Sequence, residues 1–280
     1  MKTELHKRRD GSVLTLQRHK EILRLLEQEG SVKTRTLCDL LKTSRETVRR
    51  DLETLEKQKK LKRIHGGAIK LGTVDESGNT YTSFQQRSRV SMEYKEAIAY
   101  EAAKLISPGQ VVALDCGTTA LALAKVIKRQ FTVLTVVTNS LAIANELADA
   151  EGITLLLTGG IYSPDEQGFL SDMATLILPH INIDIFFITT CGISLERGIT
   201  YQRMEDVSIQ AKLMEASGKT IVITDSSKLG VNSLARMCGI EEIAMVVTDS
   251  RAPAATIQAL EQAGIHVVIS KEPQDSCACG

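Results

Sequence analysis

Apolar and polar positions follow two different patterns along the chain. Between residues 16 and 56 apolar side chains recur every three or four positions, which predicts amphipathic helices. Beyond residue 110, short apolar runs alternate with helix-like stretches, which is typical of a sheet covered by helices. The intervening residues are polar and rich in turn formers. We therefore predict an N-terminal domain over residues 1–71, a linker over 72–90 and a second domain over 91–280.

The first part contains signals for three helices. One apolar stripe is formed by Leu16, Ile22, Leu23 and Leu26, and Gly30 stands where that helix should end. A second short helix is expected over Lys33–Leu41. The run Thr43-Ser44-Arg45-Glu46 has the spacing of a capping box, so a third helix should start near Ser44.

The third helix has distinct faces. Val48, Leu52 and Leu55 recur at helical spacing and define its core side. At about 100° per residue the opposite side carries Glu46, Arg49, Arg50 and Glu53, with Arg45 on a flank near the N-terminus.

A small hairpin should follow the helices. Two strand-like pieces in Leu61–Lys70 flank the pair Gly66-Gly67, which we interpret as the turn. This wing would present Arg63 and His65 beside the helices. Two short helices, a tight turn, a third helix with exposed cations and a wing predict a winged helix-turn-helix, with its motif at about residues 32–51.

Charge supports that interpretation. The whole chain has 34 Lys and Arg against 34 Asp and Glu, but residues 1–70 hold 19 basic and 10 acidic side chains, a net +9. The remaining residues therefore carry −9. Such asymmetry favours a nucleic-acid-binding segment joined to an acidic domain. Solvated cations on a small helical unit are the alternative for any single residue. The candidate DNA-binding residues are Lys33, Ser44, Arg45, Glu46, Thr47, Arg49, Arg50, Arg63 and His65.

The second part predicts a mostly parallel sheet. Its strands are expected at Val111–Leu114, Val133–Val137, Ile153–Leu157, Ile185–Ile188, Thr220–Ile223, Met245–Val247 and Val267–Ile269. Its helices are expected at Met92–Ile106, Ala120–Ile127, Leu141–Leu147, Met204–Ala216 and Pro253–Ala263.

Small polar residues and glycines follow six of these strands. Ligands of open α/β sheets bind at the carboxyl ends of strands, so these exits should form a polar cup. Gly117-Thr118-Thr119 opens a helix and is suited to a phosphate, Lys228 supplies a cation, and Asp115 and Asn139 suit sugar hydroxyls. The alternative is that these residues are ordinary helix caps. The candidate effector-binding residues are Asp115, Gly117, Thr118, Thr119, Thr138, Asn139, Ser140, Gly159, Gly160, Asp225 and Lys228.

Composition excludes several classes. No window is long and apolar enough for a membrane helix, and no secretory signal is expected, so we predict a cytoplasmic protein with six reduced cysteines. No metal site or cofactor is expected, since the cysteines of the Cys277-Ala278-Cys279 tail lack partners at metal-ligand spacing. Dinucleotide and ATP fingerprints are absent from the sequence.

The chain resembles the DeoR family of bacterial transcriptional regulators over about residues 16–270. The N-terminal resemblance rests on Arg18, Ile22 and Leu26, on Ser44-x-x-Thr47-Val48-Arg49-Arg50-Asp51-Leu52, and on His65-Gly66-Gly67-Ala68. The C-terminal resemblance rests on Arg87, Lys95-x-x-Ile98-Ala99, Asp115-x-Gly117-Thr118-Thr119, Thr138-Asn139-Ser140, Gly159-Gly160, Gly192, Gly198 and Asp225-Ser226-Ser227-Lys228-x-Gly230. Leu229, Ser194 and Gln210 depart from the residues usual in the family, which bears on the identity of the effector.

This resemblance implies a sensor domain similar in fold to sugar-phosphate isomerases and coenzyme A transferases. It also implies a repressor of a carbohydrate-utilisation operon, relieved by a phosphorylated sugar and acting on operator DNA as a homodimer or homotetramer. An isomerase- or transferase-like enzyme with a basic N-terminal appendage is the alternative, with Asp115, Asp225 or Glu205 as acid-base groups. We expect no enzyme, because the resemblance is to sensors.

Overall fold

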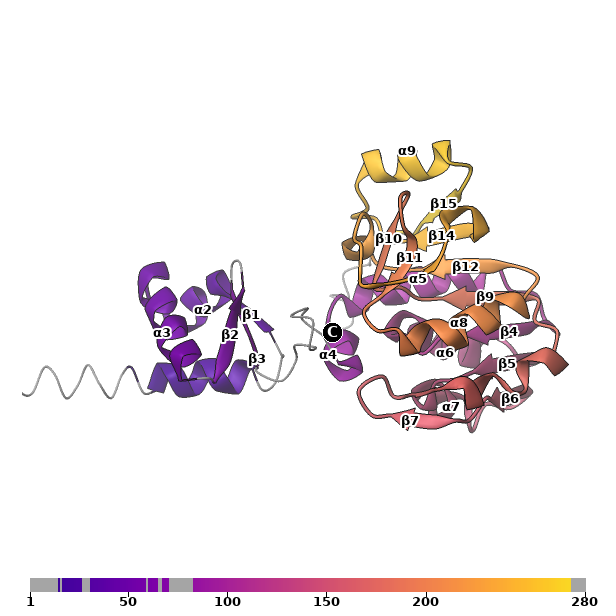
Figure 1. The fold of residues 1–280 in the computed structure, drawn as a ribbon, viewed down its shortest axis with the longest axis horizontal. Helices are drawn as coiled ribbons and strands as arrows, with labels where there is room; N and C mark the ends of the chain where they lie inside the picture. The colour runs from indigo at the N-terminus through magenta and orange to yellow at the C-terminus, as the bar shows by residue number, and fades with distance from the viewer. Residues whose placement is uncertain are drawn as a thin grey trace, which may run out of the picture. The chain divides into compact units, whose positions relative to one another are not determined.

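The protein consists of two compact units, Met1–Gln86 and Arg87–Gly280 (Figure 1). The computed structural model describes residues 15, 17–26, 31–58, 60–64, 67–70 and 83–272. The predictions for Leu16, Gly30, His65, Gly66, most of the linker and the two tail cysteines lie outside the described residues. The side chain of Lys33 lies outside them as well.

The first unit is a small helical domain with a three-stranded sheet. Residues 17–26 are helical and are followed by β1 (Ser31–Lys33), α2 (Thr34–Leu41), α3 (Arg45–Lys57), β2 (Leu61–Ile64) and β3 (Gly67–Lys70). The antiparallel strand order is β1-β3-β2. Its core is made by Ile22, Leu25, Leu26, Val32, Leu37, Val48, Leu52, Leu55, Leu61 and Ala68. The predicted core side of the third helix is thus confirmed.

Three local predictions for this unit need correction. Lys33 belongs to β1, where it pairs with Gly67, because Val32 enters the core beside Ala68. Gly67 also pairs with Ile64, so it starts β3 and is not a turn residue. The third helix begins at Arg45 with Ser44 as N-cap, which puts Thr47 at the third helical position. Glu46 is one residue too early for the predicted capping box.

The second unit is built on a seven-stranded, wholly parallel sheet of order β15-β14-β12-β9-β4-β5-β6. These strands are β4 (Val111–Leu114), β5 (Leu134–Thr138), β6 (Ile153–Leu157), β9 (Ile185–Ile188), β12 (Thr220–Ile223), β14 (Met245–Thr248) and β15 (His266–Ile269). Each overlaps a predicted strand. The chain runs from β4 outward through β5 and β6, and then returns to place β9 on the other side of β4. A ligand crevice of an open sheet forms at such a switch point, here between β4 and β9.

Helices cover both faces of this sheet (Figure 1). They are α5 (Met92–Ala103), α6 (Thr118–Gln130), α7 (Leu141–Leu147), α8 (Glu205–Glu215) and α9 (Ala254–Gln262). A short helix, α4 (Phe84–Arg89), precedes them in the sequence. Residues of α5, α6 and α7 pack with Leu114 and Phe187 in one core, whereas α8 and α9 share the other core with Ala113 and Phe186. Because successive strand residues point to opposite faces and helices cover both, the central strands β9 and β12 are buried along their whole length.

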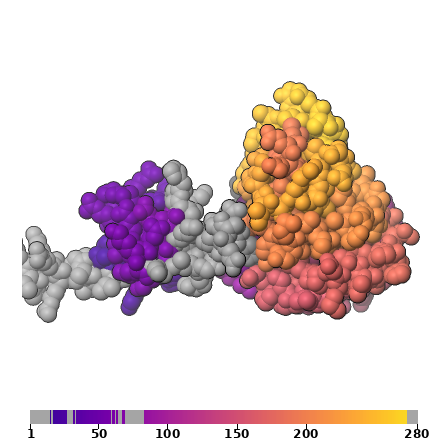
Figure 2. All heavy atoms as spheres, in the orientation of Figure 1, coloured from indigo at the N-terminus to yellow at the C-terminus, as the bar shows by residue number. Residues whose placement is uncertain are grey.

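Five short strands were not predicted. They are β7 (Ile161–Ser163), β8 (Gly168–Leu170), β10 (Gly192–Ser194), β11 (Gly198–Tyr201) and β13 (Ala235–Cys238). β7 and β8 form a hairpin, and β10, β11 and β13 form a separate antiparallel sheet. Four short 3-10 turns also occur, at Asp172–Thr175, Leu178–His180, Ser226–Lys228 and Ile240–Glu242. At the top of the unit in Figures 1 and 2, α9 and the β10–β11 hairpin lie side by side.

Candidate DNA-binding and effector sites

The third helix of the first unit, α3, carries five of the predicted DNA-binding residues: Arg45, Glu46, Thr47, Arg49 and Arg50. Ser44 caps it by accepting a hydrogen bond of 3.2 Å from the Thr47 amide. Arg45, Arg49 and Arg50 are exposed, as the sequence predicts. Arginine in this position on a helix suits guanine edges and phosphates.

Carboxylates of the same helix already pair with two of these arginines. Arg49 donates to Glu46 at 2.9 and 3.0 Å and to Glu53 at 2.6 Å, and Arg50 donates to Glu46 at 3.1 Å. Hydrogen bonds from Arg49 and then from Arg50 lower the pKa of Glu46 to about 2. Exposed pairs of this kind are weak and screened by salt, so phosphates can replace the carboxylates. Glu46 therefore acts here as a counter-ion.

Arg63 of β2 lies against the same acidic residues. Its guanidinium is 3.0 Å from the Glu53 carboxylate, and its amide donates to Glu56 at 2.8 Å. The wing is thereby tied to α3, which gives Arg63 a structural role beside its predicted one.

A buried ion pair joins α3 to the helix at residues 17–26. Asp51, only 5% exposed, accepts hydrogen bonds from Arg18 at 2.8 and 3.1 Å and lies 3.1 Å from His19 Nε2. Arg18 and Asp51 both belong to the family signature, but neither was predicted as a site residue. Their spacing of 33 residues carries no local periodic signal.

The centre of the second unit's site is Asp115, at the end of β4. Its carboxylate is 1% exposed and accepts from the Cys116 amide at 2.6 Å, from Gln210 at 2.5 Å, and from the amide and hydroxyl of Thr189 at 3.0 and 2.5 Å. Burial raises its pKa in spite of these bonds. The Tyr201 hydroxyl, which donates to the Thr189 carbonyl at 2.6 Å, lies 3.3 Å away. Asp115 thus holds β4, β9, β11 and α8 together.

The exits of β4 and β5 do not form the open cup that the sequence predicts. The β7–β8 hairpin covers them: the Phe169 amide donates to the Asn139 carbonyl at 2.7 Å, and Gly168 lies against Cys116 and bridges Ser140. Thr138, Asn139 and Ser140 are fully buried as a result. Thr138 donates to the Leu114 carbonyl, and Ser140 caps α7 by accepting from the Ile143 amide. The Asn139 side-chain oxygen is buried without a hydrogen-bond partner.

Glycines permit close packing at the exits of β4 and β6. A side chain at Gly117, the N-cap of α6, would meet the Thr189 hydroxyl at 2.1 Å. Gly159 and Gly160 follow β6 with φ of +70° and +111°, which L residues rarely adopt. Thr118 is half-buried and Thr119 buried, both in the first turn of α6.

A group of cations gathers around Asp225, beyond β12. Lys95 of α5 is 6% exposed and donates to the Arg87 carbonyl at 2.5 Å. Burial lowers the pKa of Lys95 to about 8; Asp225 acts against this shift, and the charges of Arg87 and Lys228 add to it. Asp225 itself caps the following turn by accepting from Ser227. Lys95 was not among the predicted effector-binding residues, because a single lysine in a helix normally indicates a solvent-exposed face.

A second ionic group joins α4 to α8. Glu166, in the loop between β7 and β8, forms ion pairs with Arg87 and, at 3.3 Å, with Arg203. Arg203 also lies 3.4 Å from Asp206 in the first turn of α8. Burial raises the pKa of Asp206 to about 7; Arg203 opposes the shift, and Glu166 and Asp115 add to it.

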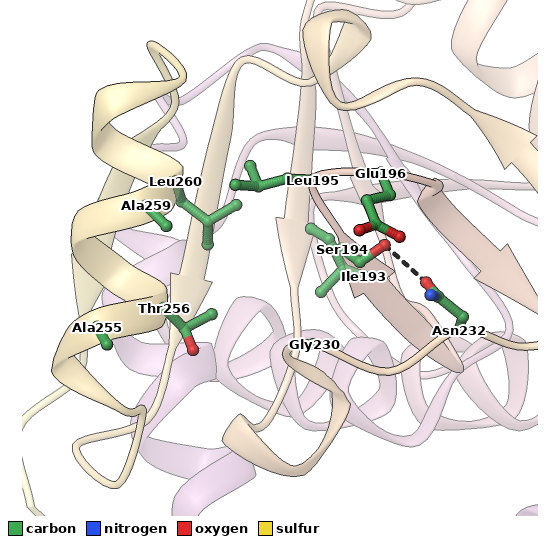
Figure 3. A pocket seen from close by; sticks show the side chains of 10 residues that line it. All are labelled: Ile193, Ser194, Leu195, Glu196, Gly230, Asn232, Ala255, Thr256, Ala259 and Leu260. Carbon is green, nitrogen blue, oxygen red and sulfur yellow. Dashed lines mark hydrogen bonds between the residues drawn. The ribbon is translucent and has the colours of Figure 1, made fainter.

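One cavity of the second unit opens beside Arg203, and another lies between α9 and β10. One, of about 520 Å³, has Arg203 and Ser208 on the α8 side and Ile161, Tyr162 and Leu170 on the hairpin side. The other, of about 400 Å³, lies between α9 and β10, with Ile193 and Leu260 in its lining and a 2.6 Å hydrogen bond from Ser194 to Asn232 at its edge (Figure 3). None of the predicted effector-binding side chains lines either cavity.

The cysteines among the described residues are free, and three have raised pKa values. Burial raises the pKa of Cys116, Cys191 and Cys238, the last to about 12, which supports packing roles over reactive thiolates. Within the described part of the chain, no group of His, Cys, Asp and Glu is placed to hold a metal ion. The helices there include none long and apolar enough to cross a membrane.

Comparison with known proteins connects both units to one family. Residues 18–73 match the DeoR-like helix-turn-helix domain and residues 90–250 match the DeoR C-terminal sensor domain. The chain is 34% identical to the HTH-type transcriptional repressor GlcR of Bacillus subtilis (strain 168), over 90% of this chain and 95% of that protein. It is 33% identical to the HTH-type transcriptional regulator GolR of Listeria innocua, over 91% and 98%.

A third relative is the glycerol-3-phosphate regulon repressor of Escherichia coli (strain K12), 30% identical over 87% of this chain and 94% of that protein. Among solved structures, ribose 5-phosphate isomerase A from Methanocaldococcus jannaschii overlaps 48% of this chain and 53% of its own, with 17% identity and a TM-score of 0.36. Overlap at that level carries no argument about activity. The two domain matches and the full-length relatives place this chain in the DeoR family of DNA-binding transcriptional regulators.

Proposed function

We propose that this chain represses a carbohydrate-utilisation operon and that a phosphorylated sugar bound in its sensor domain relieves the repression. The proposal rests on one observation: this chain of a transcriptional-regulator family contains both a DNA-binding domain, which we call the head, and a second unit with a buried cation, Lys95. A relative named for the glycerol-3-phosphate regulon supports a phosphorylated effector.

The head reads DNA through α3. The helix lies in the major groove, with Arg45 and Arg49 at base edges and Arg50 at a phosphate. On binding, Arg49 exchanges Glu46 and Glu53 for the acceptor atoms of a base edge, and Arg50 exchanges Glu46 for a phosphate. One head makes too few contacts for selective binding, so two or more copies read repeated half-sites.

The effector's phosphate binds where cations and helix amides are available. Lys95 and Lys228 supply the charge, and the amides at Gly117–Thr119, which start α6 without a side-chain cap, donate hydrogen bonds. Asp115 acts as a positioning residue, because its carboxylate is occupied by four protein donors.

Effector binding is transmitted through Arg87. The Lys95 ammonium donates to the Arg87 carbonyl, so a phosphate that attracts Lys95 loosens α4. Since α4 lies within the predicted linker, residues 72–90, this release changes the arrangement of DNA-binding domains that fits the operator. Linkage then requires operator DNA to weaken effector binding by the same factor.

An enzyme is the competing interpretation, and the side chains argue against it. Asp115 is buried and fully hydrogen-bonded, Asp225 caps a turn, and Glu205 is exposed at a helix start. A general base needs an accessible lone pair next to the substrate. Turnover of a phosphosugar at ordinary enzyme rates would favour the enzyme instead.

The DNA part is tested by titrating upstream DNA of the chain's own operon. Affinity should fall about a thousandfold or more between 50 and 200 mM salt if 6–10 phosphates are contacted. The double variant Arg49→Ala/Arg50→Ala should lose operator binding and keep effector binding. Arg24→Ala is the matched control, since Arg24 is an equally exposed arginine paired with Glu21 three residues away. Salt-independent binding contradicts the proposal.

The effector part is tested by a thermal-shift screen of phosphorylated sugars against their unphosphorylated parents. Only phosphorylated compounds should raise Tm, and Lys95→Met or Lys228→Met should abolish the shift. Lys104→Met, at an exposed lysine just beyond α5, should leave it unchanged. Equal shifts with unphosphorylated sugars would refute the anion site.

A further inference from the structure

The loop between β7 and β8 places one of its carboxylates between two arginines. Pro164 and Asp165 of this loop are exposed, whereas Glu166 is only 4% exposed. The Glu166 carboxylate forms ion pairs with Arg87 of α4 and, at 3.3 Å, with Arg203 just before α8. Burying a carboxylate is costly unless cations compensate for the lost water, so these two guanidinium groups form a site suited to an anion.

The surroundings of this arginine pair favour a carboxylate over a phosphate. Guanidinium groups bind both kinds of anion. Burial raises the pKa of Asp206 and of Asp115, and the charge of Glu166 adds to both shifts, so these carboxylates lie close enough to repel each other. A phosphate with two negative charges in the place of Glu166 would increase that repulsion. A carboxylate would leave it unchanged, because it carries the same single charge.

The arginine pair and the proposed phosphate site share one residue, Arg87. Its carbonyl accepts a hydrogen bond of 2.5 Å from Lys95, and its guanidinium pairs with Glu166. The two sites are therefore separated by about the length of one arginine side chain, which is comparable to the carbon chain of a sugar. One ligand with an acidic group at each end can reach both.

The groups around the pair suit the hydroxyls of such a ligand. Arg203 lines the cavity of about 520 Å³, a size typical of small-molecule sites, together with Ser208 and the carboxylates of Asp172 and Glu205. Serine hydroxyls and carboxylates accept hydrogen bonds from hydroxyl groups.

Two further acceptors lie at the exits that the hairpin covers. The side-chain oxygens of Asn139 and Gln210 are buried without a hydrogen-bond partner, which is costly for a polar atom. The Gln210 amide donates to Asp115 at 2.5 Å, so its oxygen lies in the same region as that carboxylate. A polyhydroxylated ligand would supply donors to both oxygens.

We propose that Arg87 and Arg203 bind the carboxylate of a phosphorylated sugar acid, and that Glu166 takes the place of that carboxylate in this structure. The inference rests on the proposed function, because the phosphate of the same ligand binds at Lys95 and Lys228. The effector class is thereby narrowed from phosphorylated sugars to those with a second acidic group.

Exchange of the two carboxylates releases the β7–β8 hairpin. The ligand replaces the ion pairs of Glu166 one for one, and Glu166 regains water at the surface. The hairpin is then held at the exits of β4 and β5 by backbone contacts such as the 2.7 Å bond from the Phe169 amide to the Asn139 carbonyl. Gln167 has a φ of +51°, so the closed loop is held against the preference of a non-glycine residue. Loss of the Glu166 ion pairs should therefore let the hairpin open.

The anion site is tested in the full-length chain by Glu166→Ala and acetate. The substitution removes the internal carboxylate and leaves space for a small one between the arginines, so Tm should fall. Acetate should restore part of the loss with saturation, and chloride at the same ionic strength should not. Adding Arg203→Met to Glu166→Ala should abolish the rescue. Glu215→Ala is the matched control, since Glu215 is an exposed partner of Lys212 and its loss should create no acetate site.

The ligand class is tested on the wild type with matched pairs that differ only at C1: glucose 6-phosphate against 6-phosphogluconate, and ribose 5-phosphate against 5-phosphoribonate. In calorimetric titrations the better acid should bind about tenfold or more tightly than its aldose, as expected for hydrogen bonds between charged groups. Arg203→Met should remove this preference and leave binding of the aldose phosphate unchanged. The acid alone should speed hydrogen exchange in peptides from β8.

The outcomes separate this inference from the proposed function. Equal stabilisation of wild type and Glu166→Ala by acetate, or no rescue at all, overturns the carboxylate site. Aldose phosphates that bind as tightly as the acids, in a way that depends on Lys95, refute the inference and leave the repressor with a phosphorylated effector. Acetate rescue together with equal binding of gluconate and 6-phosphogluconate would keep the carboxylate site and refute the phosphate site.

Discussion

The ion pair between Arg18 and Asp51 should hold the reading helix in place, and Asp51→Asn tests this directly. The substitution keeps the shape of the side chain and removes its charge. Arg18 then faces a neutral amide where it had two charge-assisted hydrogen bonds of 2.8 and 3.1 Å.

The expected cost follows from the burial of the pair. Removing one partner of a fully buried ion pair costs about 3–5 kcal/mol. Asp51 is 5% exposed, but the side chain of Arg18 is 22% exposed and keeps some water, so we expect about 2–3 kcal/mol here. That loss corresponds to about a 30- to 150-fold rise in local opening.

Hydrogen exchange followed by mass spectrometry measures this opening within the intact chain. Peptides from α3 should exchange about 30- to 150-fold faster in Asp51→Asn, while peptides from α6 in the other unit should be unchanged. Intrinsic fluorescence would miss the effect, because the chain has no Trp and its five Tyr all follow residue 80.

A double-mutant cycle with Arg18→Met decides whether the pair is the cause. Two residues in direct contact should couple by about 1–3 kcal/mol, so the double variant should be little worse than either single one. Additive effects, or equal acceleration in α6, would refute the reasoning.

Three further predictions concern the sensor. Lys95 has a pKa of about 8 in the folded protein and 10.5 in the unfolded chain, so its charge destabilises the fold below pH 8, and this penalty disappears as the pH rises to 10.5. Lys95→Met should therefore raise the free energy of unfolding at pH 7 by up to about 3 kcal/mol, with a higher Tm, and should have no such effect at pH 10.5. Asp206, with a pKa of about 7 against 3.8, should make wild-type stability to urea fall as pH rises from about 4 to 7, and Asp206→Asn should flatten that slope. Gly117→Ala should cost about 1–3 kcal/mol in thermal unfolding, because its Cβ displaces the Thr189 hydroxyl; Gly218→Ala, whose nearest contact would be 3.5 Å, should be silent.

The sheet was predictable because burial of both faces leaves a strong signal in the sequence. Ile185–Ile188 has no polar residue, and its four side chains are all buried. The β7–β8 hairpin left no such signal, since its strands have three residues each and β7 is largely exposed. Its pairing depends on the contacts of Gly168 with Cys116 and Asn139, which follow β4 and β5 and lie far away in sequence.

The residue types of the site could be predicted from the sequence, but the burial and hydrogen bonding of those residues could not. The exits of the strands do hold the expected polar residues, yet Asn139 is covered by a hairpin that the pattern did not reveal. Lys95 looked like a surface residue because its burial depends on the Arg87 carbonyl, eight residues away and in another helix. Contacts between distant residues, as at Asp51 and Arg18, leave no trace in local periodicity.

The strand order also determines when this site can form during synthesis. β4, β5 and β6 pair with their neighbours in sequence and should assemble before β9 joins them, because their crossovers through α6 and α7 are much shorter than the segment between β6 and β9 plus the two strands before it, and shorter connections close at lower entropic cost. The partners of Asp115 come much later: Thr189 is 74 residues away and Gln210 is 95. Until β9 and α8 are added, the Asp115 carboxylate has only its neighbouring amide as a partner. We therefore expect the nascent chain to need a chaperone most after β4, β5 and β6 have been synthesised and before β9 and α8 have joined them.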